Sequence, residues 1–160
     1  MRKIVSNTTP LISLLKLDRL DILHHLYGKI FIPTAVYKEI EAGRTKEFYK
    51  DLSKIEWINI IDINNKQTIN YFLDLDSGEA EAIVLATEIS SDLIIIDEKP
   101  GRFHAKHADL KVTGTIGVLI KAKTEGFINE IKPLLEELSD KKVWISEKLK
   151  YEILNKVGEK

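Results

Sequence analysis

Cysteine is absent from this sequence of 160 residues, which excludes disulfide bonds and metal sites built from thiolates. Long apolar runs are also absent: nothing approaches the about 18 uninterrupted apolar residues of a membrane span, and no signal-peptide segment follows the basic N-terminus. Neither charge is in excess, with 24 Lys and Arg against 25 Asp and Glu. We therefore expect a cytoplasmic protein without a membrane segment. Binding to nucleic acid would need a local basic patch or a bridging metal ion.

The composition is that of an ordinary globular protein. Hydrophobic residues make up 44% of the chain and charged residues 31%. The length of 160 residues allows one domain with a real core and is too short to expect two. With no internal repeat, low-complexity tract or linker in the sequence, we expect a single domain over residues 1–160.

Short apolar runs alternate with segments of helical periodicity. The runs predict five strands, near residues 3–6, 29–32, 57–61, 93–96 and 110–113. Helical segments are predicted near residues 10–17, 18–28, 33–43, 64–75, 76–89, 100–108, 115–123, 129–139 and 146–157. Strands that alternate with helices predict an α/β fold with a parallel, doubly wound sheet of about five strands.

The run Leu93-Ile94-Ile95-Ile96 ends abruptly in two acids, Asp97 and Glu98. Four consecutive apolar residues predict a central strand that is covered on both faces. Ligands of open α/β sheets bind at the carboxyl ends of the strands, where Asp97 would lie. Asp97 is therefore the leading candidate for a functional carboxylate, although an acid after a strand also occurs as a simple turn or helix-cap residue.

Three further oxygen donors lie where they could join Asp97. Asn7 follows the first strand, Glu39 lies at the edge of the apolar face of the helix after the second strand, and Glu81 lies early in the helix before Asp97. Oxygen donors without His or Cys suit Mg²⁺ or Mn²⁺ rather than zinc. The chemistry that such a site supports is metal-assisted hydrolysis of a phosphodiester bond.

Glu79 and Glu81 compete for one place in this set. Two residues along a helix rotate the side chain by about 200°, so the two carboxylates cannot face the same site. Glu79 lies three residues after Asp76, the spacing of a capping box, which gives it a local structural role. Glu81 has no such role and lies between two small residues, so we favour Glu81 as the ligand.

Basic residues follow the Asp97 strand. Lys99, Arg102, Lys106 and Lys111 could form a rim that binds RNA phosphates, or simply a solvated helix face. Near the C-terminus, Leu149, Tyr151, Ile153 and Leu154 could contact a partner protein or pack inside the domain.

Five short motifs together resemble one known family. In chain order they are Ser6-Asn7-Thr8-Thr9-Pro10-Leu11-Ile12, Ile32-Pro33-x-x-Val36-x-x-Glu39-Ile40, Gly78-Glu79-Ala80-Glu81-Ala82-Ile83, Ile94-Ile95-Ile96-Asp97-Glu98 and Val112-Thr113-Gly114-Thr115-Ile116-Gly117-Val118-Leu119. Their order and spacing resemble PIN-domain proteins, in the prokaryotic branch similar to VapC-like toxin ribonucleases. The resemblance runs from about residue 3 to residue 155.

The resemblance implies a three-layer α/β/α sandwich and an acidic cluster that binds Mg²⁺ or Mn²⁺. It also implies a ribonuclease that cleaves single-stranded RNA, often a homodimer and often a toxin held by an antitoxin protein. Glu39, Glu81 and Asp97 match the acidic positions of the family, and Thr8 and Thr115 match hydroxyl-bearing positions near the site.

Asn7 departs from the family, which has aspartate at this position in most members. An amide oxygen can ligate a hard cation but brings no charge.

The leading hypothesis is thus a metal-dependent ribonuclease with Asn7, Glu39, Glu81 and Asp97 at its catalytic centre and with Thr8, Thr115 and Arg102 near the substrate. The alternative is a catalytically weakened module that binds RNA or a protein without cleavage. A phosphate-binding protein with a glycine-rich loop is set aside, because the segment after the first strand contains no glycine.

Overall fold

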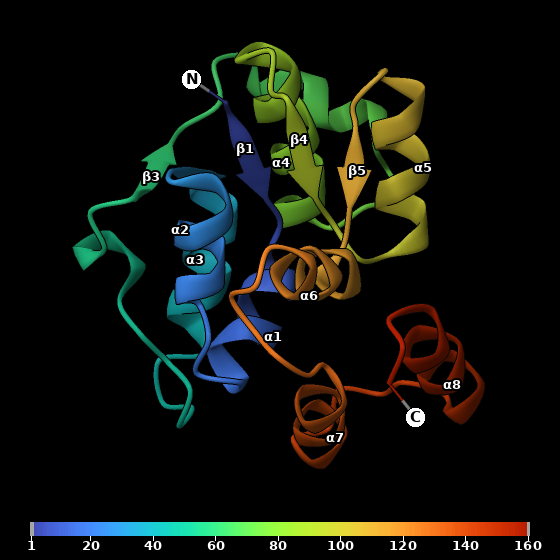
Figure 1. Ribbon diagram of the computed structural model, residues 1–160. Helices are drawn as coiled ribbons and strands as arrows, with labels where there is room; N and C mark the ends of the chain where they lie inside the picture. Colours follow the sequence, from blue (N-terminus) through green and yellow to red (C-terminus); the bar gives the residue numbers. More distant parts are fainter. Residues whose placement is uncertain (1, 160) are drawn as a thin grey trace.

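The computed structural model describes residues 2–159 and contains one five-stranded sheet (Figure 1). The strands are β1 (Ile4–Ser6), β2 (Ile30–Pro33), β3 (Ile58–Ile61), β4 (Leu93–Ile95) and β5 (Val112–Thr113). Their order in the sheet is β3-β2-β1-β4-β5, and every neighbouring pair is parallel. The prediction of a parallel sheet of about five strands is confirmed.

Helices cover both faces of the sheet, which makes the fold an α/β/α sandwich. The helices are α1 (Thr8–Lys16), α2 (Asp21–Tyr27), α3 (Thr34–Ala42), α4 (Ser77–Glu88), α5 (Lys99–His107), α6 (Thr115–Thr124), α7 (Lys132–Asp140) and α8 (Glu147–Lys156). Helices α4 and α5 pack in one apolar cluster, and the other six contribute to the second. In Figure 1, α7 and α8 lie beyond the ends of the strands at the bottom of the view.

The central strands are buried on both faces because their residues alternate between the two clusters. Ile94 and Ile96 pack with α4 and α5, whereas Ile95 packs with the cluster on the opposite face, and all three are fully buried. Ile4 and Val5 of β1 divide in the same way. A run of consecutive β-branched residues is therefore what this position in a parallel sheet requires.

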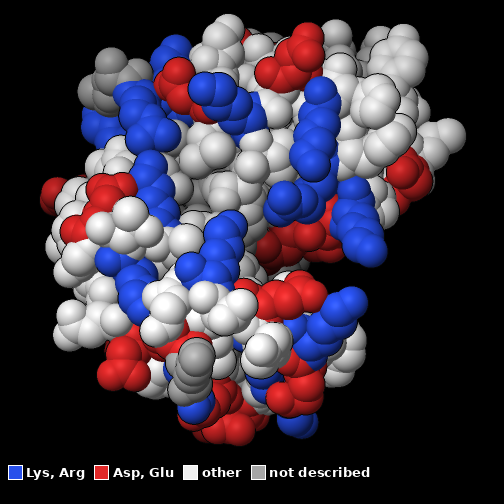
Figure 2. Space-filling model, turned by 45° about the vertical axis from the view of Figure 1, so that its right-hand side comes forward, with Lys and Arg blue, Asp and Glu red and all other residues white. Residues whose placement is uncertain are grey.

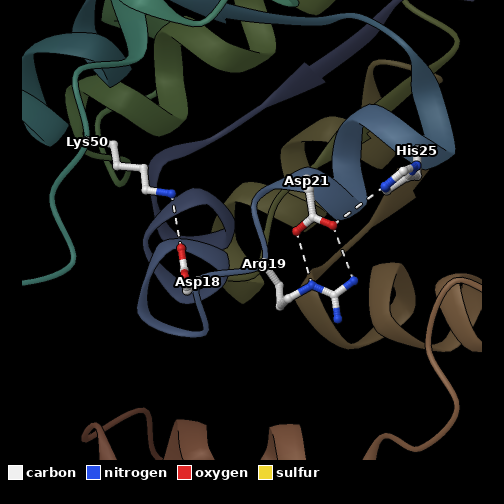
Figure 3. Close-up of polar contacts among 5 residues, drawn as sticks. All are labelled: Asp18, Arg19, Asp21, His25 and Lys50. Carbon is white, nitrogen blue, oxygen red and sulfur yellow. Dashed lines mark hydrogen bonds and ion pairs between the residues drawn. The ribbon is translucent and has the colours of Figure 1, made fainter.

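Some helical segments are shorter than expected. The region 64–75 contains only a 3₁₀ helix, η2 (Lys66–Tyr71), and a second one, η1 (Leu52–Lys54), precedes β3. Helix α2 begins at Asp21 and not at Asp18, because Asp18 adopts the left-handed backbone conformation of a turn, with a φ of 53°. Figure 3 shows that Asp18 pairs with Lys50 instead, with 3.0 Å between Nζ and Oδ1.

The turn between α1 and α2 has a second small polar network. Both guanidinium contacts of Arg19 go to Asp21, at 3.1 and 3.2 Å, and His25 approaches the same carboxylate at 3.6 Å (Figure 3). These groups lie at the surface, where such pairs contribute little to stability. Separately, no helix within residues 2–159 is long and apolar enough to cross a membrane.

Candidate active site

The carboxyl ends of β1, β4 and β5 meet at one edge of the sheet. Ser6 is in register with Ile95, and Ile95 with Thr113, so the residues that follow these three positions lie side by side. The backbone N–H of Asn7 donates to the carbonyl of Ile95 at 2.9 Å. Asn7, Asp97 and the start of α6 are therefore brought together by strand register, as the position of Asp97 after its strand predicted.

The carboxylate of Asp97 is held by the first residue of α6. The backbone N–H of Thr115 donates to Oδ1 and its hydroxyl donates to Oδ2, each at 2.7 Å. Charge-assisted hydrogen bonds of this kind are short and strong, so they hold the carboxylate in one orientation. A Cβ atom on Gly114 would lie 2.6 Å from Oδ1, so only glycine leaves room for this carboxylate. Arg102 lies beside it and donates to the carbonyl of Ile96 at 3.2 Å.

Glu39 joins the N-termini of two helices. The hydroxyl of Thr8 in α1 donates to Oε2, and the backbone N–H of Gly78 in α4 donates to Oε1 at 3.0 Å. Burial raises the pKa of Glu39 above its usual value; the Thr8 hydrogen bond opposes this, and the nearby charges of Asp76 and Glu98 add to it. The carboxylate is thus fixed in position among other acids.

Glu79 is the most perturbed acid of the group. Its side chain is only 7% exposed, and its Oε2 atom is buried without a hydrogen-bond partner in the described chain. Burial raises its pKa to about 7, with further contributions from Asp76 and Glu98. Asp76 caps α4 by accepting from the Glu79 N–H at 2.8 Å. In a complete capping box, the Glu79 carboxylate would also accept a hydrogen bond from the backbone at the start of the helix. Its Oε2 atom makes no such bond in the described chain.

Glu98 belongs to the same cluster and was not singled out from the sequence. Its Oε2 accepts from the hydroxyl of Thr9 at 2.9 Å, whereas Oε1 is buried and unpartnered within residues 2–159. Asn7 is 2% exposed, and its buried Oδ1 likewise has no hydrogen-bond partner in the described part of the chain. Its side chain does not cap α1, although Asn7 occupies the N-cap position. The signal for Glu98 was its place directly after Asp97 at the end of a central strand.

Glu81 lies apart from this group. Its Oε1 accepts from the backbone N–H of Ala35 at 3.1 Å, at the first turn of α3, and its charge acts on Lys66. The sequence argument for Glu81 depended on a capping role for Glu79 that the structure shows only in part. Glu79, four and seven residues before the buried Ile83 and Ala86, faces the sheet. We therefore transfer the proposed ligand role from Glu81 to Glu79.

The donors fit a hard divalent cation in their chemistry. The set consists of carboxylates and one amide oxygen. Asn7, Glu79 and Glu98 each present a buried oxygen that has no hydrogen bond to any described residue. Burial, together with the nearby charges of Asp76 and Glu98, raises the pKa of both Glu39 and Glu79, and a bound cation would offset these effects. Within the described residues, no three His, Asp or Glu side chains already converge closely enough to hold an ion. Ion binding would therefore require side-chain adjustment.

The surface at this level of the molecule is hollowed. Figure 2 shows a recessed group of acidic side chains, with Lys and Arg side chains along its upper border. The hollow lies at the height at which β4 and β5 end in Figure 1.

Comparisons with known proteins were consistent with this architecture. The family model DUF3368, described as a PIN domain, matches residues 3–159. A search of curated proteins gave no match. Six chains of solved structures match, among them a PilT N-terminus domain protein from the hyperthermophilic archaeon Sulfolobus solfataricus P2. That similarity has a TM-score of 0.56 and 21% sequence identity and covers 76% of this chain and 93% of the other.

Proposed function

Because the chain belongs to the PIN-domain family, whose members are generally nucleases, we propose that it hydrolyses phosphodiester bonds of single-stranded RNA with a divalent cation. The observation that carries the proposal is that oxygens of Asn7, Glu79 and Glu98 are buried without a hydrogen-bond partner in residues 2–159, near the carboxyl edge of the sheet where Asp97 lies. Leaving polar atoms in this state is costly unless a ligand satisfies them.

Asp97, Glu79 and Glu39 would hold Mg²⁺ or Mn²⁺, with Asn7 as a neutral oxygen donor. When bound, such an ion supplies Lewis-acid polarisation of the phosphate and lowers the pKa of a water molecule. The rest of the proposal concerns this chain's own side chains, whose contacts are in place without the ion.

Three side chains would orient the reacting groups. Thr115 fixes both oxygens of Asp97, and Thr8 fixes Oε2 of Glu39, so neither carboxylate must be ordered during the reaction. Arg102 uses one guanidinium nitrogen on the Ile96 carbonyl. Its other N–H groups can donate to phosphate oxygens of the substrate.

The test combines metal binding with cleavage. We expect calorimetric titration to show that Mn²⁺ binds to the wild type and not to Asp97→Asn. We also expect the wild type to cleave labelled single-stranded RNA and the addition of EDTA to stop the cleavage. Asp109→Asn is the matched control, because Asp109 is exposed and its φ of 59° suits asparagine. An Asp97→Asn variant as active as the wild type would refute the assignment.

A second candidate is a weakened member of the family that binds RNA or a protein without cleaving. Asn7 motivates it, because an uncharged residue occupies a buried position among acids where most of the family has aspartate. Asn7→Asp discriminates between the two: a disarmed enzyme gains Mn²⁺ affinity or activity, whereas a working site that uses the amide gains neither. The toxin role, the antitoxin partner and the homodimer remain predictions from the resemblance.

A further inference from the structure

Helix α5, which begins two residues after Asp97, has an unusual charge distribution. Its nine residues contain Lys99, Arg102 and Lys106 but no acid. Lys99, Phe103 and Lys106 are separated by four and three residues, so they lie on one side of the helix, and all three are exposed. The opposite side carries the buried Gly101 and Ala105. We call Lys99, Phe103 and Lys106 the outer face of α5.

The cations of this face are not used inside the described part of the chain. Neither Lys99 nor Lys106 forms an ion pair within residues 2–159, whereas six other lysines do: Lys50, Lys66, Lys121, Lys123, Lys141 and Lys150. The helix dipole favours a cation at Lys106 but opposes one at Lys99, in the first turn. An unpaired cation in the first turn of a helix is better explained by an external anion than by local stability.

Phe103 presents an aromatic ring to solvent between these two cations. Its side chain is 57% exposed, and its centroid lies 4.1 Å from that of His107. The His104 ring meets the Phe103 ring edge-on, with 5.5 Å between centroids, and lies 5.1 Å from the Phe72 ring; Asp74 contacts His104 Nε2 at 2.9 Å. The Phe103 ring thus contacts two histidine rings of its own helix while more than half of the residue stays exposed, and an exposed aromatic ring can serve as a platform for base stacking.

The outer face of α5 is continuous with the candidate active site. The connection runs through Arg102, which directly precedes Phe103 in the chain and lies beside Asp97, while Gly101 on the buried side of the same helix packs against Glu79. From the rise of a helix, Phe103 lies about 6 Å and Lys106 about 10 Å beyond Lys99 along the axis. A strand that leaves the acidic cluster along α5 would therefore meet a cation, a ring and a second cation in turn.

We propose that the outer face of α5 is a subsite for the RNA strand next to the cleaved bond, with one base stacked on Phe103 and phosphates bound by Lys99 and Lys106. The inference rests on the proposed function, because the subsite would bind the same RNA strand that the candidate active site cleaves. Stacking on one ring tolerates any base, so this subsite holds the strand without reading its sequence.

The experiment measures binding without cleavage. A fluorescein-labelled single-stranded RNA on the order of ten nucleotides long, with 2-aminopurine at successive positions, is titrated with protein in EDTA and again in Ca²⁺. Phe103→Ala should weaken binding about 5- to 100-fold and abolish quenching of one 2-aminopurine, with the salt dependence unchanged. Phe103→Trp should keep both the RNA affinity and the quenching of that 2-aminopurine. The double variant Lys99→Ala/Lys106→Ala should reduce the slope of log K against log salt by about 1.4.

Phe127→Ala is the matched control. Phe127 is 38% exposed and stacks on His25 with 5.0 Å between centroids, but it lies after the far end of α6 from Thr115. Thermal unfolding of each variant verifies the fold. RNA binding that Phe103→Ala leaves unchanged overturns the subsite alone, and the face would then be available to a protein partner. A folded wild type that binds no RNA in either buffer overturns the subsite as well, and the cleavage assay decides separately on the proposed function.

Discussion

Gly101 and Glu79 are in contact: a Cβ atom on Gly101 would lie 2.8 Å from Oε2 of Glu79 and 2.5 Å from Cδ1 of Ile96. The first turn of α5 thereby closes over a carboxylate that has no hydrogen bond on that oxygen in the described chain. Glycine at this position is what allows the acid to be buried between α4 and α5.

Gly101→Ala should therefore displace Glu79 and overpack the cluster. We expect a loss of about 1 to 3 kcal/mol in the free energy of unfolding, together with weaker Mn²⁺ binding. Urea unfolding and calorimetry measure the two effects. Gly43→Ala is the control, because a Cβ atom there meets its neighbours at an ordinary 3.5 Å. Equal stability of Gly101→Ala and the wild type would contradict the close contact.

The two neighbouring glutamates of α4 should separate by function. Glu79→Gln removes a charge from the cluster and should abolish Mn²⁺ binding and RNA cleavage. Glu81→Gln leaves the cluster intact, and its amide oxygen can still accept from the Ala35 N–H in a neutral hydrogen bond, so cleavage should persist. Both variants are compared in the same cleavage assay. The reverse result would restore Glu81 as the ligand.

The stability of the metal-free protein should depend on pH through Glu79. Its folded pKa of about 7 lies above the usual 4.5, so between these values the folded chain binds a proton that the unfolded chain has released. The stabilisation is present below about pH 4.5 and is lost as the pH rises through about 7. The free energy of unfolding should fall by on the order of 2 kcal/mol over this window.

Urea unfolding in EDTA at a series of pH values measures this dependence. Glu79→Gln should flatten the profile between pH 5 and about 7.5, whereas Glu81→Gln should follow the wild type. If Glu79→Gln retained the full slope, another group would be responsible for it.

The hydroxyl of Thr115 should matter for Asp97. Thr115→Val removes the 2.7 Å hydrogen bond to Oδ2 and keeps the backbone bond to Oδ1. We expect a loss of about 2 kcal/mol in the free energy of unfolding and slower RNA cleavage. Thr124→Val in the same helix is the control, since among residues 2–159 its exposed hydroxyl bonds only to the Ile120 carbonyl within α6. Similar effects of the two substitutions would argue against a special role for Thr115.

The sequence by itself determined the architecture. Apolar runs such as Ile94-Ile95-Ile96 specify strands covered on both faces, and the alternation of strands with helices specifies a parallel sheet. The same local information placed Asp97 and Asn7 at the carboxyl edge, because the end of a parallel strand is visible in the apolar pattern. The predicted helix over residues 64–75 is only the short 3₁₀ helix η2, because a weak helical pattern of apolar residues does not form a longer helix without packing to stabilise it.

Only the tertiary structure decided which acids lie near one another at this edge of the sheet, where the charge of Glu98 acts on both Glu39 and Glu79. The antiparallel packing of α3 on α4 brings Glu39 to Gly78 and Glu81 to Ala35, and so separates Glu81 from the cluster. Glu98 joins through Thr9 of a helix far away in the sequence. Helical periodicity shows which face a residue occupies but not what packs against that face. The convergence of acids depends on strand register and helix packing, which arise from contacts between distant segments.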